Sequence, residues 1–158
     1  MEQKKRNKIS VLFIDDEPHN RNSFKASFRR NFRITLAASG EEGLELFQEI
    51  RPEVVISDQR MPGLEGVDVL KQIKRMDPHP CRILLTGYSR IDSVQEAIQK
   101  GIIDIYMQKP WDSQKLIEAI VAGAELNSDR IAGLIKDVVQ PDEKDLNGDK
   151  VHSIQQPF

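Results

Sequence analysis

The chain has 158 residues, of which 39% are hydrophobic and 30% are charged, and its formal net charge is −2 at pH 7. This length predicts one domain with a short appended segment, and the charge gives no general attraction to nucleic acid or to an anionic membrane. The basic run 4–6 leads into polar residues and a short apolar segment, unlike a signal peptide or a membrane span. We therefore expect a cytoplasmic protein. Its single cysteine, Cys81, excludes an internal disulfide.

Short β-rich runs alternate with amphipathic helical patterns along the chain, which is typical of a parallel sheet with helices on both faces. The first run, residues 9–14, is almost continuously apolar, as expected of a central strand buried on both faces. The helical pattern that follows places Phe24 and Phe28 on its inner face. The predicted strands cover residues 9–14, 33–37, 54–57, 82–86 and 103–107.

Two of the predicted helices carry clear local signals. Ser39 and Glu42 have the spacing of a capping box at the start of the second helix. Ile91, Val94 and Ile98 share one face of the fourth helix, which predicts that all three point toward the core.

The end of the last helix allows two interpretations. An apolar seam with spacings of three and four residues continues past residue 126, which predicts a linker helix or a helix that forms a homodimer. Alternatively, Asn127 and Ser128 end the helix and cap a short separate one on the same domain. The polar segment 140–158 predicts a flexible tail or a linker. The seam consists of Ile117, Ile120, Ala124, Asn127, Ile131, Leu134 and Val138.

Several residues with chemical potential stand where the predicted strands end. Asp15 and Asp16 follow the first strand, Asp58 follows the third, Thr86 ends the fourth, and Lys109 follows the fifth. Ligands of doubly wound sheets bind at this edge. Clustered carboxylates repel one another and raise one another's pKa unless a hard cation neutralises them. The sequence therefore predicts a divalent cation, Mg²⁺ or Mn²⁺, at this edge.

With a cation present, these side chains suit phosphoryl transfer, which needs a nucleophile and groups that stabilise charge on the phosphoryl oxygens. Asp58 is the candidate nucleophile. Lys109 supplies a positive charge and Thr86 a hydroxyl donor. Each residue alone has an ordinary interpretation as a helix cap, turn, strand or loop residue. Their joint placement at strand ends favours a phosphoacceptor site.

The chain contains, in this order, the segments FIDDEP, SDQRMPGLEGVDVL, ILLTGYS and IYMQKPW. In order and spacing, these four segments resemble the receiver domains of bacterial two-component response regulators, such as chemotaxis receivers. The resemblance covers nearly all of residues 8–126, which predicts a receiver domain there, a helical extension over 127–139 and the tail beyond it. It implies an α/β, doubly wound, flavodoxin-like parallel sheet of five strands in the order 2-1-3-4-5.

The resemblance also implies individual metal ligands. Asp16 and Asp58 would bind the cation directly, Asp15 would act through water, and the backbone carbonyl of Arg60 would supply a further ligand. The peptide bond between Lys109 and Pro110 is expected to be cis.

A conformational switch is implied as well. Phosphorylated Asp58 would draw Thr86 inward and let Tyr106, at the family's aromatic switch position, turn from exposed to buried. Arg60 and Tyr88, each two residues beyond a site residue, are candidates for tuning the lifetime of the acyl phosphate.

The preferred hypothesis is a signalling module that a histidine kinase or a phosphotransfer protein phosphorylates. It is not expected to be an enzyme beyond self-catalysed phosphotransfer and autodephosphorylation, and it would act on a downstream protein target or a missing output domain. One alternative is an aspartyl-phosphate phosphohydrolase. Those enzymes typically place the nucleophile after the first strand with a second Asp two positions on, whereas Asp15 and Asp16 are adjacent here. Another is a receiver-like scaffold that works without phosphorylation. No helix-turn-helix pattern is evident, so direct nucleic-acid binding is not expected.

Overall fold

The structure, a computed structural model, describes the backbone of residues 7–87 and 92–139 and the side chains of residues 7–87 and 92–133. Five parallel strands form one sheet in the order β2-β1-β3-β4-β5. This confirms the predicted flavodoxin-like fold and its strand order. The strands are β1 (Ser10–Ile14), β2 (Arg33–Ala37), β3 (Val54–Ser57), β4 (Cys81–Thr86) and β5 (Ile105–Gln108).

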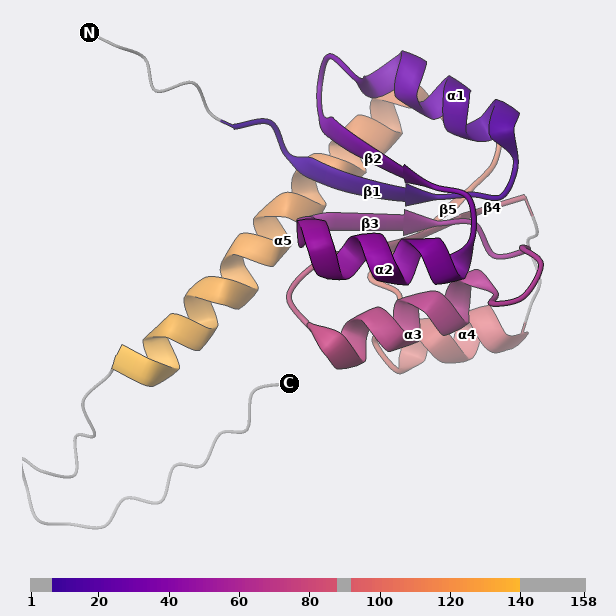
Figure 1. Ribbon diagram of the computed structural model, residues 1–158. Coiled ribbons are helices and arrows are strands. Elements are labelled where there is room, and N and C mark those ends of the chain that lie inside the picture. Colours follow the sequence, from indigo (N-terminus) through magenta and orange to yellow (C-terminus); the bar gives the residue numbers. More distant parts are fainter. Residues whose placement is uncertain (1–6, 88–91, 140–158) are drawn as a thin grey trace, which may run out of the picture.

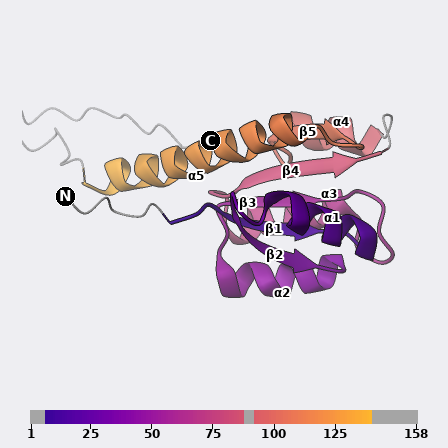
Figure 2. The same cartoon turned by 90° about the horizontal axis from the view of Figure 1, so that it is seen from above.

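Helices cover both faces of the sheet (Figure 1, Figure 2). One face carries α1 (Pro18–Phe28) and α5 (Ser113–Val139), and the other carries α2 (Gly40–Ile50), α3 (Gly66–Met76) and α4 (Asp92–Gln99). Each face of the sheet therefore has its own hydrophobic core, as expected of a parallel sheet that is buried on both sides.

The core beneath α1 and α5 is rich in aromatic side chains. Phe24 and Phe28 are fully buried, as their helical spacing predicts. Phe24 stacks on Phe13 of β1, with ring centroids 4.0 Å apart, and Trp111 meets both of these rings edge-on. Because Trp111 lies between β5 and α5, this cluster holds the connection that begins at Lys109.

The predicted capping box at α2 is present with one altered bond. The Ser39 hydroxyl accepts a hydrogen bond from the amide of Glu42 at 3.1 Å. The Glu42 carboxylate accepts in return from the amide of Ala38, at 3.4 Å, and not from that of Ser39. The start of α2 is therefore capped from both directions.

The predicted start of the fifth strand is wrong by two residues, because β5 begins at Ile105. α4 ends in a left-handed turn at Gly101, where φ is +69°. The amides of Ile102 and Ile103 both donate to the carbonyl of Ala97, at 2.9 and 3.3 Å. Both isoleucine side chains are buried. The apolar run thus includes a helix-ending turn that packs into the core before the strand begins.

The prediction that Ile98 faces the core is also wrong, since its side chain is 46% exposed. α4 buries Val94 and Ala97 instead. α4 has only eight residues, and the face that it turns to the core carries Val94 and Ala97. Ile98 lies beside that face. Ile91 lies outside the described residues.

α5 continues without a break through Asn127, so the interpretation in which a second helix starts there is wrong. The helix has 27 residues, and Asn127 is buried. Its C-terminal half projects beyond the sheet on the side of the strands' amino ends (Figure 1). Despite this length, no helix among the described residues is long and apolar enough to cross a membrane.

Candidate functional site

The sheet register brings the predicted site residues together at one edge. β1 and β3 end in register, so Asp15 and Asp58 follow on adjacent strands. The amide of Asp58 donates to the carbonyl of Ile14, and the amide of Lys109 donates to that of Thr86, both at 2.9 Å. These backbone bonds extend the sheet past the strand ends and fix the positions of both side chains.

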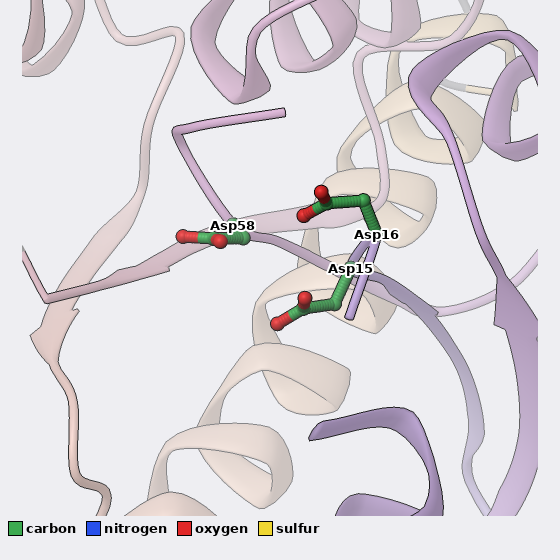
Figure 3. A group of neighbouring side chains, drawn as sticks. All are labelled: Asp15, Asp16 and Asp58. Atoms are coloured by element: carbon green, nitrogen blue, oxygen red, sulfur yellow. The ribbon is translucent and has the colours of Figure 1, made fainter. Parts of the chain in front are cut away.

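Asp15, Asp16 and Asp58 form a carboxylate cluster. One carboxylate oxygen from each lies within 4.8 Å of the other two. Figure 3 shows Asp15 and Asp16 leaving the end of β1 and Asp58 leaving the end of β3. A set of carboxylate oxygens at this spacing is the donor type that Mg²⁺ and Mn²⁺ prefer, so the residues present fit the predicted cation.

Lys109 reaches into the carboxylate cluster. Its Nζ lies 2.6 Å from Oδ2 of Asp15 and 3.4 Å from Oδ2 of Asp58. The peptide bond between Lys109 and Pro110 is cis, as expected. The ammonium group therefore bridges carboxylates that come from two different strands.

Asp15 is the most enclosed member of the cluster, with no exposed surface. Besides Lys109, its carboxylate accepts hydrogen bonds from the amide of Glu17 at 3.0 Å and from Nδ2 of Asn20 at 3.2 Å. Arg21 donates to the backbone carbonyl of Asp15 at 2.8 Å. The first turn of α1 thus holds both the side chain and the backbone of Asp15.

Burial raises the pKa of the Asp58 carboxyl above its ordinary value. The positive charge of Lys109 lowers that pKa, and the nearby charge of Asp15 raises it further. Because burial is the largest of these effects, the charged form of Asp58 is disfavoured until a positive charge compensates it.

The loop after Asp58 is fixed by Gln59, whose side chain is almost fully buried. The amide of Gln59 donates to Oδ1 of Asp58 at 2.8 Å. Its side-chain oxygen accepts from the amide of Val67 at 2.9 Å, and its side-chain nitrogen donates to Glu65 at 3.1 Å. Gln59 therefore connects Asp58 to the first turn of α3.

Thr86 and Tyr106 lie on neighbouring strands. Thr86 is fully buried and pairs with Gln108, whereas Tyr106 pairs with Leu84. Because side chains alternate along a strand, Thr86 and Tyr106 point to the same face of the sheet. Tyr106 is partly buried against the core beneath α2, α3 and α4. A movement of the Thr86 side chain would therefore change the packing on the face of the sheet that holds Tyr106.

Arg60 and Tyr88 are the two residues predicted to tune the lifetime of the acyl phosphate. The Arg60 side chain is exposed and lines a shallow cavity of about 430 Å³ together with Met61, Pro62 and Glu65. Tyr88 lies outside the described residues.

A second cavity, of about 470 Å³, lies directly beside Lys109. The other lining residues come from α1 and from the connection between β5 and α5, and they are His19, Asn20, Ser23, Pro110 and Trp111. The site is therefore open on the side that faces α1.

Comparison with known proteins decides the family. The family model of the response regulator receiver domain matches residues 11–121. The chain belongs to this family. It is thus a receiver domain of the kind found in two-component systems, and the four segments quoted above all lie within the matched region.

Two relatives and one solved structure illustrate the similarity to other receiver proteins. The hydrogenase transcriptional regulatory protein HoxA of Cupriavidus necator is 30% identical over 116 residues, which are 73% of this chain and 24% of HoxA. Sporulation initiation phosphotransferase F of Bacillus subtilis is 28% identical over 111 residues, which are 70% of this chain and 89% of that protein. The crystal structure of a response regulator receiver domain protein from Clostridium thermocellum has 33% identity and a TM-score of 0.71, and the match covers 78% of this chain and 98% of that one. The chain spans about a quarter of the length of HoxA.

Sequence reasoning missed two polar residues of this receiver site, Gln59 and Asn20. The Asn20 side chain donates to the Asp15 carboxylate. The backbone amide of Gln59 donates to the Asp58 carboxylate, and its side chain bonds Glu65 and Val67. A signal was present for Asn20, because a polar residue in the first turn after a strand-end acid can reach back toward that acid. Gln59 had no such signal, because its partners become neighbours only when α3 packs against the loop.

Proposed function

We propose that this receiver domain accepts a phosphoryl group on Asp58 and passes the signal on through a changed protein-binding surface. The observation that carries the proposal is the group of three carboxylates at the sheet edge, with Lys109 bridging Asp15 and Asp58. Asp15 is buried, Asp16 and Asp58 are partly buried, and one lysine contacts two of the three carboxylates. Such a cluster stabilises added negative charge only when more positive charge is supplied.

Mg²⁺ or Mn²⁺ would supply that charge, held directly by Asp16, Asp58 and the backbone carbonyl of Arg60, and through water by Asp15. Such a cation neutralises the carboxylates and the oxygens of the incoming phosphoryl group. Lys109 would provide a second positive charge for the phosphoryl group, and the Thr86 hydroxyl would donate a hydrogen bond to it.

In the proposed reaction, a carboxylate oxygen of Asp58 attacks the phosphorus of a phosphohistidine donor. A new O–P bond forms as the P–N bond of the donor breaks, and the bonding electron pair leaves with the imidazole. Hydrolysis by water later returns the free carboxylate and inorganic phosphate. These self-catalysed steps are the whole of the chemistry that we assign to the chain, so we do not propose a separate enzyme activity.

The phosphoryl donor would be a histidine kinase or a histidine-containing phosphotransfer protein. The cavity beside Lys109 leaves the site open toward α1, as a protein donor requires. We assign the receiver to residues 8–126, with residues 127–139 as a helical extension, and place the protein in the cytoplasm with such donors. The target would be a downstream protein or an output domain absent from this chain. The predicted tail, 140–158, lies outside the described residues.

The signal would leave the site through Thr86 and Tyr106. Movement of Thr86 toward the phosphoryl group would free space on the sheet face that it shares with Tyr106. The Tyr106 ring would then turn inward and alter the surface formed by α4, β5 and α5. Exposed Arg60, and Tyr88, would tune how fast water reaches the acyl phosphate.

Incubation with Mg²⁺ and acetyl phosphate, followed by intact-mass measurement, tests phosphoryl acceptance. The parent chain should gain the mass of one phosphoryl group, and Asp58→Asn should not. A phosphorylated Tyr106→Ala variant should in turn lose the change in partner binding that the parent shows. Absence of an adduct with acetyl phosphate and with a histidine kinase, or an equal adduct on Asp58→Asn, would overturn the proposed function.

A further inference from the structure

Gln59 lies between Asp58 and Arg60, which both supply metal ligands in the proposed function. Asp58 precedes it with its carboxylate, and Arg60 follows it with its backbone carbonyl. The Gln59 side chain is only 1% exposed, although it is polar. A buried amide needs partners for both its donor and its acceptor, so its surroundings are specific for it.

Every polar group of Gln59 has a partner. Its backbone amide donates to Oδ1 of Asp58, and its backbone carbonyl accepts from the amide of Gly66 at 3.0 Å. Its side-chain oxygen accepts from the amide of Val67, which lies in the first turn of α3 and has no partner within the helix. Its side-chain nitrogen donates to Glu65. The loop is thus attached at four points around one residue.

We propose that Gln59 is a positioning residue for the cation site, in that its anchorage on α3 sets the orientation of the Asp58 carboxylate and of the Arg60 carbonyl. The inference rests on the proposed function for the identity of the ligands. Hydrogen-bonded partners behind metal ligands commonly fix their orientation and strengthen metal binding. Here a single side chain would hold the backbone between two ligands.

The test is Mg²⁺ binding to the unphosphorylated protein, measured by isothermal titration calorimetry. Gln59→Met keeps the length of the side chain and removes both of its hydrogen bonds. It should weaken Mg²⁺ binding by about tenfold or more. It should also slow phosphorylation by acetyl phosphate at limiting Mg²⁺, with recovery at saturating Mg²⁺. Ser39→Ala is the matched control, because it removes an N-terminal helix cap from α2 instead of α3 and should leave the Mg²⁺ affinity unchanged.

A second pair of variants covers the case in which Gln59→Met does not fold. Glu65 is exposed, so Glu65→Ala and Glu65→Gln should both fold. Both remove the same negative charge, but only Glu65→Gln keeps an acceptor for the Gln59 side chain. The inference predicts weaker Mg²⁺ binding for Glu65→Ala than for Glu65→Gln.

Three outcomes would overturn the inference: Gln59→Met that binds Mg²⁺ as the parent does, Ser39→Ala that weakens binding equally, or Glu65 variants with equal affinities. A parent chain that binds no Mg²⁺ and takes no phosphoryl group would instead remove the proposed function itself. The two failures are therefore distinguishable.

Discussion

At the residue scale, Asp58 is enclosed by backbone as well as by charge. The start of α3 lies so close to it that a Cβ atom on Gly66 would stand 2.1 Å from the Asp58 carbonyl oxygen. The Ser57 hydroxyl donates to the same oxygen at 2.9 Å. Asp58 therefore has little freedom to move away from the carboxylate cluster, which suits the nucleophilic role that we propose for it.

Gly66→Ala should destabilise the protein by about 2 kcal/mol or more, because the added methyl group meets backbone that cannot yield easily. Gly133→Ala on α5 is the opposite control. An added Cβ there meets nothing within 4 Å, so the substitution should stabilise the helix by about 0.5–1 kcal/mol. Urea denaturation of both variants measures the difference, and equal effects of the same sign would contradict this description of the contact.

The raised pKa of Asp58 has a consequence for stability in the absence of divalent cations. A carboxyl whose pKa is higher in the folded than in the unfolded state costs stability once the pH has risen through that raised pKa. Asp58→Asn should therefore raise the Tm of the Mg²⁺-free protein at pH 7. The advantage should shrink as the pH falls and Asp58 of the parent takes up a proton.

Thermal unfolding between pH 4 and pH 8 checks this expectation. Asp129→Asn, on an exposed position of α5, is the matched control for the loss of one carboxylate. If Asp58→Asn lowered the Tm at neutral pH, or if the difference did not depend on pH, burial would not dominate the ionisation of Asp58.

At the element scale, the far end of the sheet is tied together by two arginines and one aspartate. Arg130 of α5 donates to both carboxylate oxygens of Asp104, at 2.7 and 3.1 Å. Arg82 of β4 is only 2% exposed, and its backbone amide donates to the same carboxylate. The guanidinium of Arg82 donates to the carbonyl oxygens of Pro78, Pro80, Gly101 and Ile102.

This network anchors the part of α5 that lies beyond Asn127. Arg130 lies past Asn127, and its bonds to Asp104 hold that part of α5 against the turn before β5. Burial lowers the pKa of Arg82, whereas the charge of Asp104 raises it. A buried arginine is retained at low cost only when its donors are satisfied, as they are here.

Arg130→Ala should destabilise the protein by about 2 kcal/mol, because it removes charged hydrogen bonds and leaves the partly buried Asp104 with fewer donors. The neighbouring Asp129→Ala should change stability by less than about 0.5 kcal/mol. Chemical denaturation provides the comparison. Equal stabilities of Arg130→Ala and the parent would show that α5 is held by its apolar contacts alone.

At the scale of the whole molecule, the candidate site could be located from the sequence because its residues end strands or directly follow them. An apolar run that ends in Asp15 and Asp16 marks both a strand and its functional edge. Strand order is less local, and only the resemblance to receiver domains supplied it.

Other features depended on hydrogen-bond partners that the hydrophobic pattern does not reveal, and they were therefore missed. β5 begins two residues later than predicted because the amides of Ile102 and Ile103 bond to the end of α4. Asp104 bonds α5 beyond Asn127 through Arg130, and the role proposed for Gln59 rests on its bonds to α3. Local periodicity contains no information on such partners.

The central claim, that Asp58 is the residue that carries the phosphoryl group, can be tested by chemical trapping. Borohydride reduces an aspartyl phosphate to homoserine and so marks the residue permanently. Trypsin cleavage after Arg33 and Arg60 releases a peptide in which Asp58 is the only aspartate, while Asp15 and Asp16 fall in another peptide. After treatment with Mg²⁺, acetyl phosphate and borohydride, mass spectrometry should find homoserine at position 58. Homoserine at position 15 or 16, or none in a protein that had gained a phosphoryl group, would contradict the assignment.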